Sequence, residues 1–463
     1  MRNDTMPTTV ATTDSVPRSI LRRVVIASGL GTLLEYFDYA SYSYLATTIA
    51  IVFFPPEDRA VALMSTFAVF ALSFLVRPLG AFVWGSLGDK IGRKSILATT
   101  IILMSGATFL IGFIPNYATI GIAAPILLLL LRVTQSFSAS GEYAGAGTFV
   151  AEYAPAAKRG LLTSVVPIAA AAGFLAASLM ATILYASTSP EFMQEWGWRI
   201  PFLIAGPLGI VGLWLRLRLE DTPQFRRVLE LEKKQRQSAV DQPPASNRWS
   251  ETRKSLPSML KALLVMSLNA GAYYLLLSYT PSFLIEEAGM SEATATLVVT
   301  IGLVAHIIFI PLAARLSDRI GRKRTLMISS IAFIVLSYPI MTLLSFGGVV
   351  LASAVLIVSL MFFAMNDAVF PSFFTELFGT RSRYLGFALP FNVGAMLFGG
   401  VAPLIGTWLI ATTGNPSSPA FFLMGIGVLS LVGLLMSAET ARKPLADEQA
   451  EVRKQSVPHV TAP

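Results

Sequence analysis

Long apolar runs alternate with short polar segments along almost the whole chain. We count twelve such runs, and each is long enough to cross the ~30 Å hydrocarbon core of a membrane as a helix. One long polar interruption, at 220–256, has six runs on either side of it. The predicted spans are 21–53, 61–84, 95–114, 119–147, 161–186, 199–219, 257–285, 292–313, 325–346, 348–374, 385–412 and 419–438.

A short basic segment occurs at the same place in each group of six runs. Residues Gly85–Lys94 read GSLGDKIGRK, and Ala314–Lys323, 229 residues later, read ARLSDRIGRK, with six of ten positions identical. An acid and an arginine seven residues apart are also repeated, as Glu152 with Arg159 and as Glu376 with Arg383. Such repeats indicate a duplicated bundle and are typical of transporters. We therefore predict an all-α membrane protein, with twelve transmembrane helices in two pseudo-symmetric six-helix halves.

The polar interruption and the two ends divide the chain into five predicted parts. These are an N-terminal tail (1–20), a first six-helix bundle (21–219), a central loop (220–256), a second bundle (257–438) and a C-terminal tail (439–463). We expect the central loop to be a solvated linker. The C-terminal tail is short and polar, and we expect it to be disordered.

Composition and charge agree with a membrane protein and predict its orientation. Hydrophobic residues make up 54% of 463 positions and charged residues 13%, about half the charged fraction of a soluble chain. Of the 35 Lys and Arg residues, 31 fall in seven segments on one side of the twelve-span arrangement. The positive-inside rule then predicts that both termini are cytoplasmic. We expect a multi-pass protein of the bacterial inner membrane. This topology accounts for the net charge of +8 without nucleic acid as a partner.

The absence of certain residues and motifs from the chain argues against several classes of chemistry. It has no cysteine and two histidines, which disfavours disulfides and a metal centre. It has no phosphate-binding Gly-x-x-x-x-Gly-Lys-Ser/Thr motif, so it is not itself an ATP-driven pump. No nucleophile–base constellation suggests an enzyme, and we expect no cofactor.

The first span carries two acids and two tyrosines on one helical face, namely Glu35, Asp38, Tyr39 and Tyr42. A charged carboxylate at membrane depth costs at least ~2.5 kcal/mol, so such acids need a partner, a water-filled cavity or a proton. We predict that Glu35 and Asp38 couple transport to protons and that the tyrosines contact substrate. The alternative is that either acid only pairs with a basic residue across the bundle.

Two arginines lie inside predicted spans of the first half. Arg77 can bind a carboxylate with two parallel hydrogen bonds, and we predict that it contacts substrate; a static ion pair with Glu35 or Asp38 is the alternative. Arg132 shares a helical face with Gln135, a predicted substrate contact, and Glu142 follows nearer the cytoplasmic end. Arg132 can have a functional role inside the span, or it can form a purely structural pair with an acid.

In the second half, neutral polar side chains and one acid occur within predicted spans. We predict that they complete a substrate site at the junction of the halves, although Asn and Tyr also bridge packed membrane helices. His306 is expected to be a packing or helix-bridging residue rather than a proton relay. The predicted contacts are Asn269, Tyr273, Tyr274, Asn366, Asp367 and Asn392.

The repeated loop resembles the signature loop of the major facilitator superfamily, and other stretches resemble its metabolite:proton symporter branch. That branch contains carriers for 2-oxoglutarate, citrate, shikimate and other carboxylates, and for proline or betaine. Phe37, Ser140 and Ala314 depart from its commoner residues. The similar stretches are 34–39 with Tyr42, 77–80, 132–135 leading to 140–142, 220–225, 376–378 with Arg381 and Arg383, and 392–403.

The resemblance implies roles for the signature loops and for the first-half charges. It implies that Asp89 and Asp318 tie each half to a neighbouring helix start and hold the cytoplasmic side shut. An acid at a helix N-terminus stabilises the helix by ~0.3–1 kcal/mol. It also implies that Arg132 takes part in proton coupling, and we group Glu142 with it. The predicted gate residues are Gly85, Asp89, Gly92, Arg93, Asp318, Gly321 and Arg322.

We expect a proton-coupled symporter that imports a small organic acid, such as a mono- or dicarboxylate, by alternating access. Two alternatives stay open. One is a proline/betaine-type osmoprotectant symporter, whose relatives tend to carry a C-terminal coiled coil, whereas 439–463 contains no heptad run. Its substrate's ammonium group would need an aromatic cage, for which Tyr39, Tyr42 and Tyr273 are candidates. The other is a non-transporting receptor on the same fold. Expected partners are a small-molecule substrate, protons and lipid, and we expect a monomer.

Overall fold

The first half of the chain folds into the six predicted spans, several of which are interrupted helices. The computed structural model describes residues 18–55, 58–91, 93–217, 248–443 and 445, and these residues form helices and connecting turns without strands. The helices are α1 (Arg18–Tyr44), α2 (Ala46–Phe53), α3 (Arg59–Phe74), α4 (Arg77–Ile91), α5 (Arg93–Ile111), α6 (Tyr117–Ile120), α7 (Ala123–Ala139), α8 (Glu142–Tyr153), η1 (Ala156–Lys158), α9 (Arg159–Thr163), α10 (Val165–Ser187), α11 (Pro190–Phe192), η2 (Met193–Gly197) and α12 (Arg199–Leu217).

The second half repeats this plan. Its first helix begins at Arg248, upstream of the predicted 257, because the polar residues 248–256 outside the apolar run continue the helix and Pro257 is accommodated within it. The elements are α14 (Arg248–Tyr273), η3 (Tyr274–Tyr279), α15 (Thr280–Glu286), α16 (Glu292–Ile320), α17 (Arg322–Ser345), α18 (Val349–Asp367), α19 (Phe370–Leu377), α20 (Thr380–Gly394), η4 (Ala395–Gly399), α21 (Ala402–Thr413) and α22 (Pro419–Leu435).

The predicted twelve spans are confirmed. Among the described residues nine helical segments are long and apolar enough to cross a membrane, and Ala98–Ile111 and Pro419–Leu435 are shorter apolar helices. The pair α1–α2 makes the remaining span. Several breaks fall near Pro or Gly, as at Ser140–Gly141 between α7 and α8. Irregular backbone within the membrane is tolerated where it is buried in protein or lines a cavity.

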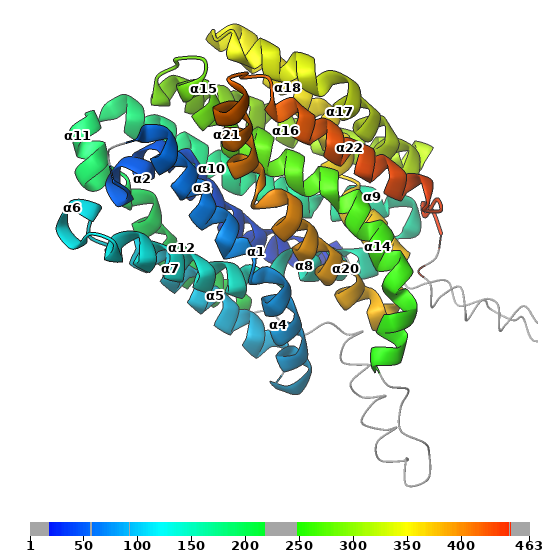
Figure 1. Cartoon of the computed structure of the whole chain (residues 1–463). Helices are drawn as coiled ribbons and strands as arrows, with labels where there is room; N and C mark the ends of the chain where they lie inside the picture. Colours follow the sequence, from blue (N-terminus) through cyan, green and yellow to red (C-terminus); the bar gives the residue numbers. More distant parts are fainter. Residues whose placement is uncertain (1–17, 56–57, 92, 218–247, 444, 446–463) are drawn as a thin grey trace, which may run out of the picture.

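The packing of helices shows the duplication directly. In the first half α1 packs on α10, α3 on α7, and α5 on α12; in the second half α14 packs on α20, α16 on α18, and α17 on α22. These are equivalent pairs in the two repeats. The two groups lie side by side, blue to green and green to red (Figure 1). They meet where α10 packs on α16, α4 and α8 on α20, and α3 on α21.

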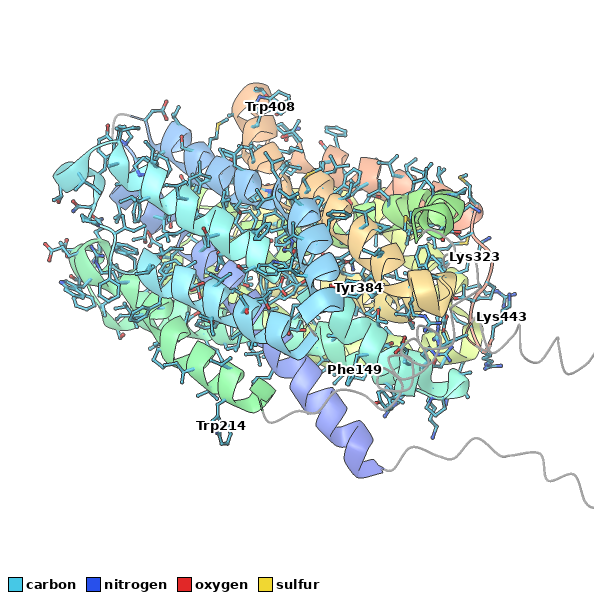
Figure 2. All side chains as sticks on the ribbon, turned by 90° about the horizontal axis from the view of Figure 1, so that it is seen from below. Phe149, Trp214, Lys323, Tyr384, Trp408 and Lys443 are labelled. Atoms are coloured by element: carbon cyan, nitrogen blue, oxygen red, sulfur yellow. The ribbon has the colours of Figure 1, made fainter. Side chains whose placement is uncertain are left out.

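The outer surface of the bundle is apolar, as a lipid-facing surface must be. Trp214 and Trp408 are 51% and 50% exposed, and Figure 2 shows them projecting from the ribbon away from each other. Many Leu, Ile and Val side chains are exposed beside them. The protein is therefore a multi-pass membrane protein.

Two ends of the bundle are distinguished below. The latch end is where the α16–α17 turn, α9 and residues 439–443 meet; Figure 2 shows Lys323 and Lys443 together there. The distal end carries the start of α3 and the end of α15, joined by Arg59 and Glu286. The tails 1–20 and 439–463 and the loop 220–256 lie largely outside the described residues, so the predicted domain boundaries stay a prediction.

Candidate functional site

Arg77 lies at the junction of the two halves and joins them. It begins α4 and its side chain is 1% exposed. It donates to Oε1 of Glu35 at 3.0 Å, to the hydroxyl of Tyr39 at 3.1 Å and, across the halves, to Oδ1 of Asn392 at 3.0 Å. The structure therefore brings together four predicted site residues and shows the ion pair that we considered as the alternative for Arg77.

Asp38 belongs to a second buried chain of hydrogen bonds. Thr108 donates to Oδ2 of Asp38 at 2.7 Å, Gln135 donates to Thr108 at 2.8 Å, and Arg132 donates to Gln135 at 2.6 Å. The Arg132 guanidinium also lies 4.2 Å from the centre of the Tyr42 ring. Arg132 thus reaches Asp38 through two intermediates. Thr108, an isolated Thr in an apolar run, gave no sequence signal.

Glu142 completes a group of acids near the centre of the first half. It begins α8, is 7% exposed, and is close enough to Glu35 to interact electrostatically with it. Glu35, Asp38 and Glu142 therefore lie in one region, which is the placement that their predicted role in proton coupling requires. The role itself stays a prediction.

A narrow cavity between the halves is walled mainly by aromatic rings. Tyr36 and Tyr143 come from the first half, and Tyr273, Tyr274 and Phe391 from the second. The Tyr36 and Tyr273 ring centres are 5.4 Å apart, and Tyr143 stacks on Phe391 at 4.7 Å. Its accessible volume of about 10 Å³ is close to that of one water molecule. The centre is therefore occluded in this conformation.

The cavity differs from the predicted aromatic cage. Of the three cage candidates Tyr273 lines it, but Tyr39 and Tyr42 do not; Tyr274, predicted as a substrate contact, also lines it. The Tyr42 hydroxyl donates to the Thr66 carbonyl at 2.8 Å, and its ring stacks on Phe70. A helical face is readable from sequence, whereas the neighbour that each residue on it meets is not. Sequence reasoning therefore missed Tyr36, Tyr143 and Phe391.

A polar cluster from the second half forms another part of the cavity wall. Asn269 donates to Oδ1 of Asn366 at 3.0 Å and to Oδ1 of Asp367 at 3.3 Å. Asn269 and Asp367 line the cavity. His306, expected to be a packing or helix-bridging residue, lies with Nε2 3.2 Å from Oδ2 of Asp367 on α18. The cavity thus has an acid at its second-half side and the Arg77 network close by.

Buried charges hold the halves together at the latch end. Asp318 accepts from the backbone N–H groups of Gly160 and Leu161, both at 3.0 Å, in the first turn of α9 in the other half. Arg322 donates to Asp318 at 2.7 Å and pairs with Glu376 at 3.4 Å. Asp318 thus sits at a neighbouring helix start, as the sequence resemblance implied.

Two further pairs cross between the halves at this end. Arg159 pairs with Glu376 at 3.3 Å, and Arg383 pairs with Glu152 at 3.0 Å. The acid–arginine repeat found in the sequence is therefore a reciprocal exchange, in which the acid of each half binds the arginine of the other. We call this set the ionic latch: Glu152, Arg159, Asp318, Arg322, Glu376 and Arg383.

The rest of the predicted gate is described in part. Gly321 has φ of +109°, a conformation that favours glycine, at the turn between α16 and α17. In the first signature loop, Gly92 lies outside the described residues. The surroundings of Gly85 and the side chains of Asp89 and Arg93 also lie outside the description. Their predicted role stays a prediction.

The first residues of the predicted disordered tail are ordered against the latch. Glu439 accepts from the backbone N–H groups of Arg322 and Lys323, at 2.9 and 3.2 Å, and so caps α17. Thr440 donates to Glu376 at 2.7 Å. The prediction of disorder was wrong for these residues because polar composition does not reveal a capping partner. The remainder, from 446, lies outside the described residues.

Comparison with known proteins agrees with the fold and shows the family. The sequence matches the Major Facilitator Superfamily over residues 30–389 and 263–461. It is 39% identical to a proline/betaine transporter of Salmonella typhimurium, over 96% of this chain and 89% of that protein. It is also 39% identical to a glycine betaine/proline/ectoine/pipecolic acid transporter of Dickeya dadantii, over 92% of this chain and 85% of the relative.

Solved structures share the same fold at lower sequence similarity. A proton:xylose symporter bound to 6-bromo-6-deoxy-D-glucose superposes with a TM-score of 0.73 at 19% identity, covering 94% of this chain and 99% of that one. A partially occluded inward-open xylose transporter from E. coli gives 0.70 at 17% identity, covering 92% of this chain and all of that one. The chain therefore belongs to the major facilitator superfamily, in the same family as the proline/betaine transporters that it resembles in sequence.

Proposed function

We propose that this protein is a proton-coupled symporter for small zwitterions that carry a carboxylate and a substituted ammonium group, such as betaine or proline. The observation that carries the proposal is the aromatic cavity with Asp367 in its wall. Ring faces attract a substituted ammonium group, and a carboxylate beside them adds a counter-charge. The transporters of 39% identity take the same class of compound by name.

This conclusion replaces the organic acid that the sequence favoured. That expectation rested on Arg77, whose charge in a low-dielectric cavity favours an anion. In the structure Arg77 is already paired with Glu35, so its charge is largely compensated. The names of the relatives also favour the betaine alternative, although residues 439–463 contain no heptad run.

The Arg77 network suggests how a proton and a substrate could be bound together. Protonation of Glu35 removes the negative charge beside Nη2 of Arg77. The freed guanidinium can then bind the substrate carboxylate with two parallel hydrogen bonds. Substrate and proton thereby favour each other's binding, as symport requires. The basic residues of the latch end support a cytoplasmic location for that end.

Binding of two molecules of nearly equal shape tests the substrate class. Glycine betaine and 3,3-dimethylbutanoate share a carboxylate and a bulky end, but the second has carbon in place of the cationic nitrogen. We expect purified protein to bind glycine betaine at least about tenfold more tightly, since a desolvated cation–π contact contributes about 2 kcal/mol. Thermal stabilisation as a function of ligand concentration gives both affinities. Equal or tighter binding of the uncharged-end analogue would restore the organic-acid interpretation.

A further inference from the structure

The hydroxyl of Tyr273 is a buried polar group that the Arg77 network does not use. Tyr273 ends α14, is 4% exposed, and lines the cavity between the halves. Among the described residues, its hydroxyl has no hydrogen-bond partner. Two tyrosines of the first half differ from it. The Tyr39 hydroxyl accepts from Arg77 at 3.1 Å, whereas the Tyr42 hydroxyl donates to a backbone carbonyl at 2.8 Å.

Aromatic neighbours hold the Tyr273 ring in place. The ring centres of Tyr36, Phe174 and Phe363 lie 5.4, 5.2 and 5.9 Å from its own, all in edge-to-face arrangements. The chain also passes at the next residue from α14 into η3, a π-helix, and such turns are frequent at functional sites. Because these contacts restrict the ring, its hydroxyl keeps a fixed position. A buried hydroxyl without a partner is costly, so the group calls for an explanation.

Asp367 is a second hydrogen-bond acceptor in this part of the wall. It lines the same cavity and lies close enough to Tyr273 to interact with it electrostatically. Its Oδ1 accepts from Asn269 at 3.3 Å, and its Oδ2 lies 3.2 Å from Nε2 of His306. A carboxylate has about four lone-pair sites, so these contacts leave it able to accept further hydrogen bonds. The wall thus offers two acceptors, the Asp367 carboxylate and the Tyr273 oxygen.

Such a wall distinguishes two kinds of substituted ammonium group. A secondary ammonium group, as in proline, carries two N–H donors, whereas a quaternary group, as in betaine, carries none. Ring faces attract both kinds through their positive charge. The N–H group also gives the Tyr273 oxygen a partner, and the quaternary group leaves it unpaired. A buried group left unpaired discriminates between ligands more strongly than a small difference in shape does.

We propose that the Tyr273 hydroxyl accepts a hydrogen bond from an N–H group of the substrate and so favours N–H-bearing zwitterions over fully N-methylated ones. This rests on the proposed function, in which an ammonium group binds at the aromatic cavity. Tyr273 is the specificity-determining residue, and Asp367 gives a counter-charge to both kinds of substrate. A neutral phenol keeps its charge when it accepts a hydrogen bond. Substrate entry therefore displaces no proton here, and the coupling at Glu35 is preserved.

Two closely related compounds test this selectivity. L-Proline and N,N-dimethyl-L-proline share the ring and the carboxylate and differ in having N–H or N-methyl groups. Thermal stabilisation as a function of ligand concentration gives both affinities. The ratio of the proline affinity to the dimethylproline affinity should fall about tenfold in Tyr273→Phe, as expected for one hydrogen bond to a charged group. An unchanged ratio would overturn the proposal.

Tyr44→Phe is the matched control. In the described part of the chain the Tyr44 hydroxyl is also buried without a hydrogen-bond partner, but Tyr44 does not line the cavity. The affinity ratio should therefore stay within about twofold of the parent value. An equal fall in Tyr44→Phe and Tyr273→Phe would show that the effect is not a contact with the substrate, and the proposal would be wrong.

A comparison without ligand tests the unpaired hydroxyl by itself. Removal of a hydroxyl that has no partner should not lower the melting temperature, so Tyr273→Phe should melt at or above the parent. Tyr42→Phe, which loses a hydrogen bond to Thr66, should melt lower. An equal loss in both variants would mean that the Tyr273 hydroxyl is already bonded within the protein, which contradicts the proposal. If neither proline nor its dimethyl derivative binds the parent, the proposed function fails and the substrate contact fails with it, whereas this comparison still decides whether the hydroxyl is unpaired.

Discussion

The two halves are joined differently at the two ends of the molecule. At the latch end the contacts are buried ion pairs and charged hydrogen bonds, among them Asp318 on the start of α9 and Arg159 with Glu376. Toward the distal end a hydroxyl pair, Ser178 with Thr300 at 2.7 Å, is followed by one exposed ion pair, Arg59 with Glu286 at 2.9 Å. The Arg59 side chain is 59% exposed.

This difference indicates that different interactions must be broken to separate the two halves at each end. Breaking a buried, hydrogen-bonded ion pair by removing one partner costs several kcal/mol, whereas an exposed pair contributes about 0–1 kcal/mol. We therefore expect the ionic latch to set the balance between conformations, and the distal end to be held mainly by helix packing. Removal of charge at the latch should shift the population toward latch-open forms.

The largest effect is expected for Asp318→Ala. It leaves the N–H groups of Gly160 and Leu161 without their acceptor and removes one of the two acidic partners of Arg322. We expect the closed state to lose about 3 kcal/mol, roughly a hundredfold change in the equilibrium. The native chain has no cysteine, so the labelling rate of Ser372→Cys, buried in α19, reports opening of the latch end.

Asp58→Ala is the matched control for this variant. Asp58 also caps a helix start, accepting from Ala60 and Val61, but it does so within its own half. It should therefore lower stability by about 1 kcal/mol without faster labelling at the latch end. Equal acceleration by both variants would mean that the latch does not control opening.

A smaller effect is expected for Glu376→Gln, which removes charge and keeps shape. Glu376 accepts from Arg159, Arg322 and Thr440. The glutamine still has one accepting oxygen, so we expect a loss of about 1–2 kcal/mol and about tenfold faster Ser372→Cys labelling. Glu152→Gln, with Arg383 as partner and 22% exposure, should have less effect. An unchanged rate in Glu376→Gln would show that packing, and not charge, closes this end.

The smallest effect is expected at the distal end. Arg59→Gln removes an exposed pair, which contributes about 0.2–1 kcal/mol. Labelling of a cysteine at Ser178, which packs against α16, should accelerate less than about fivefold. High salt should reduce even this difference. A change as large as that of Asp318→Ala would remove the contrast between the two ends.

The predicted site residues show where sequence reasoning succeeded. Glu35, Asp38, Arg77 and Arg132 were recognisable because a charge inside an apolar run is costly and needs a reason. Their partners were much less visible. Thr108 and the carbonyl that accepts from Tyr42 look like any other position in a membrane helix. His306 was expected to pack or to bridge helices, and it does contact α18, but the sequence did not reveal that its partner there is Asp367.

The sequence by itself determined the number of spans, the duplication and the family, because hydropathy and repeated motifs are local properties of the chain. It also marked the acid–arginine repeat, Glu152/Arg159 and Glu376/Arg383, but not that each acid binds the arginine of the opposite half. The tertiary structure alone decided which aromatic rings wall the cavity and that Arg77 is paired with Glu35. The physical reason is that these contacts join residues far apart in the sequence, and the crossing and rotation of packed helices select them.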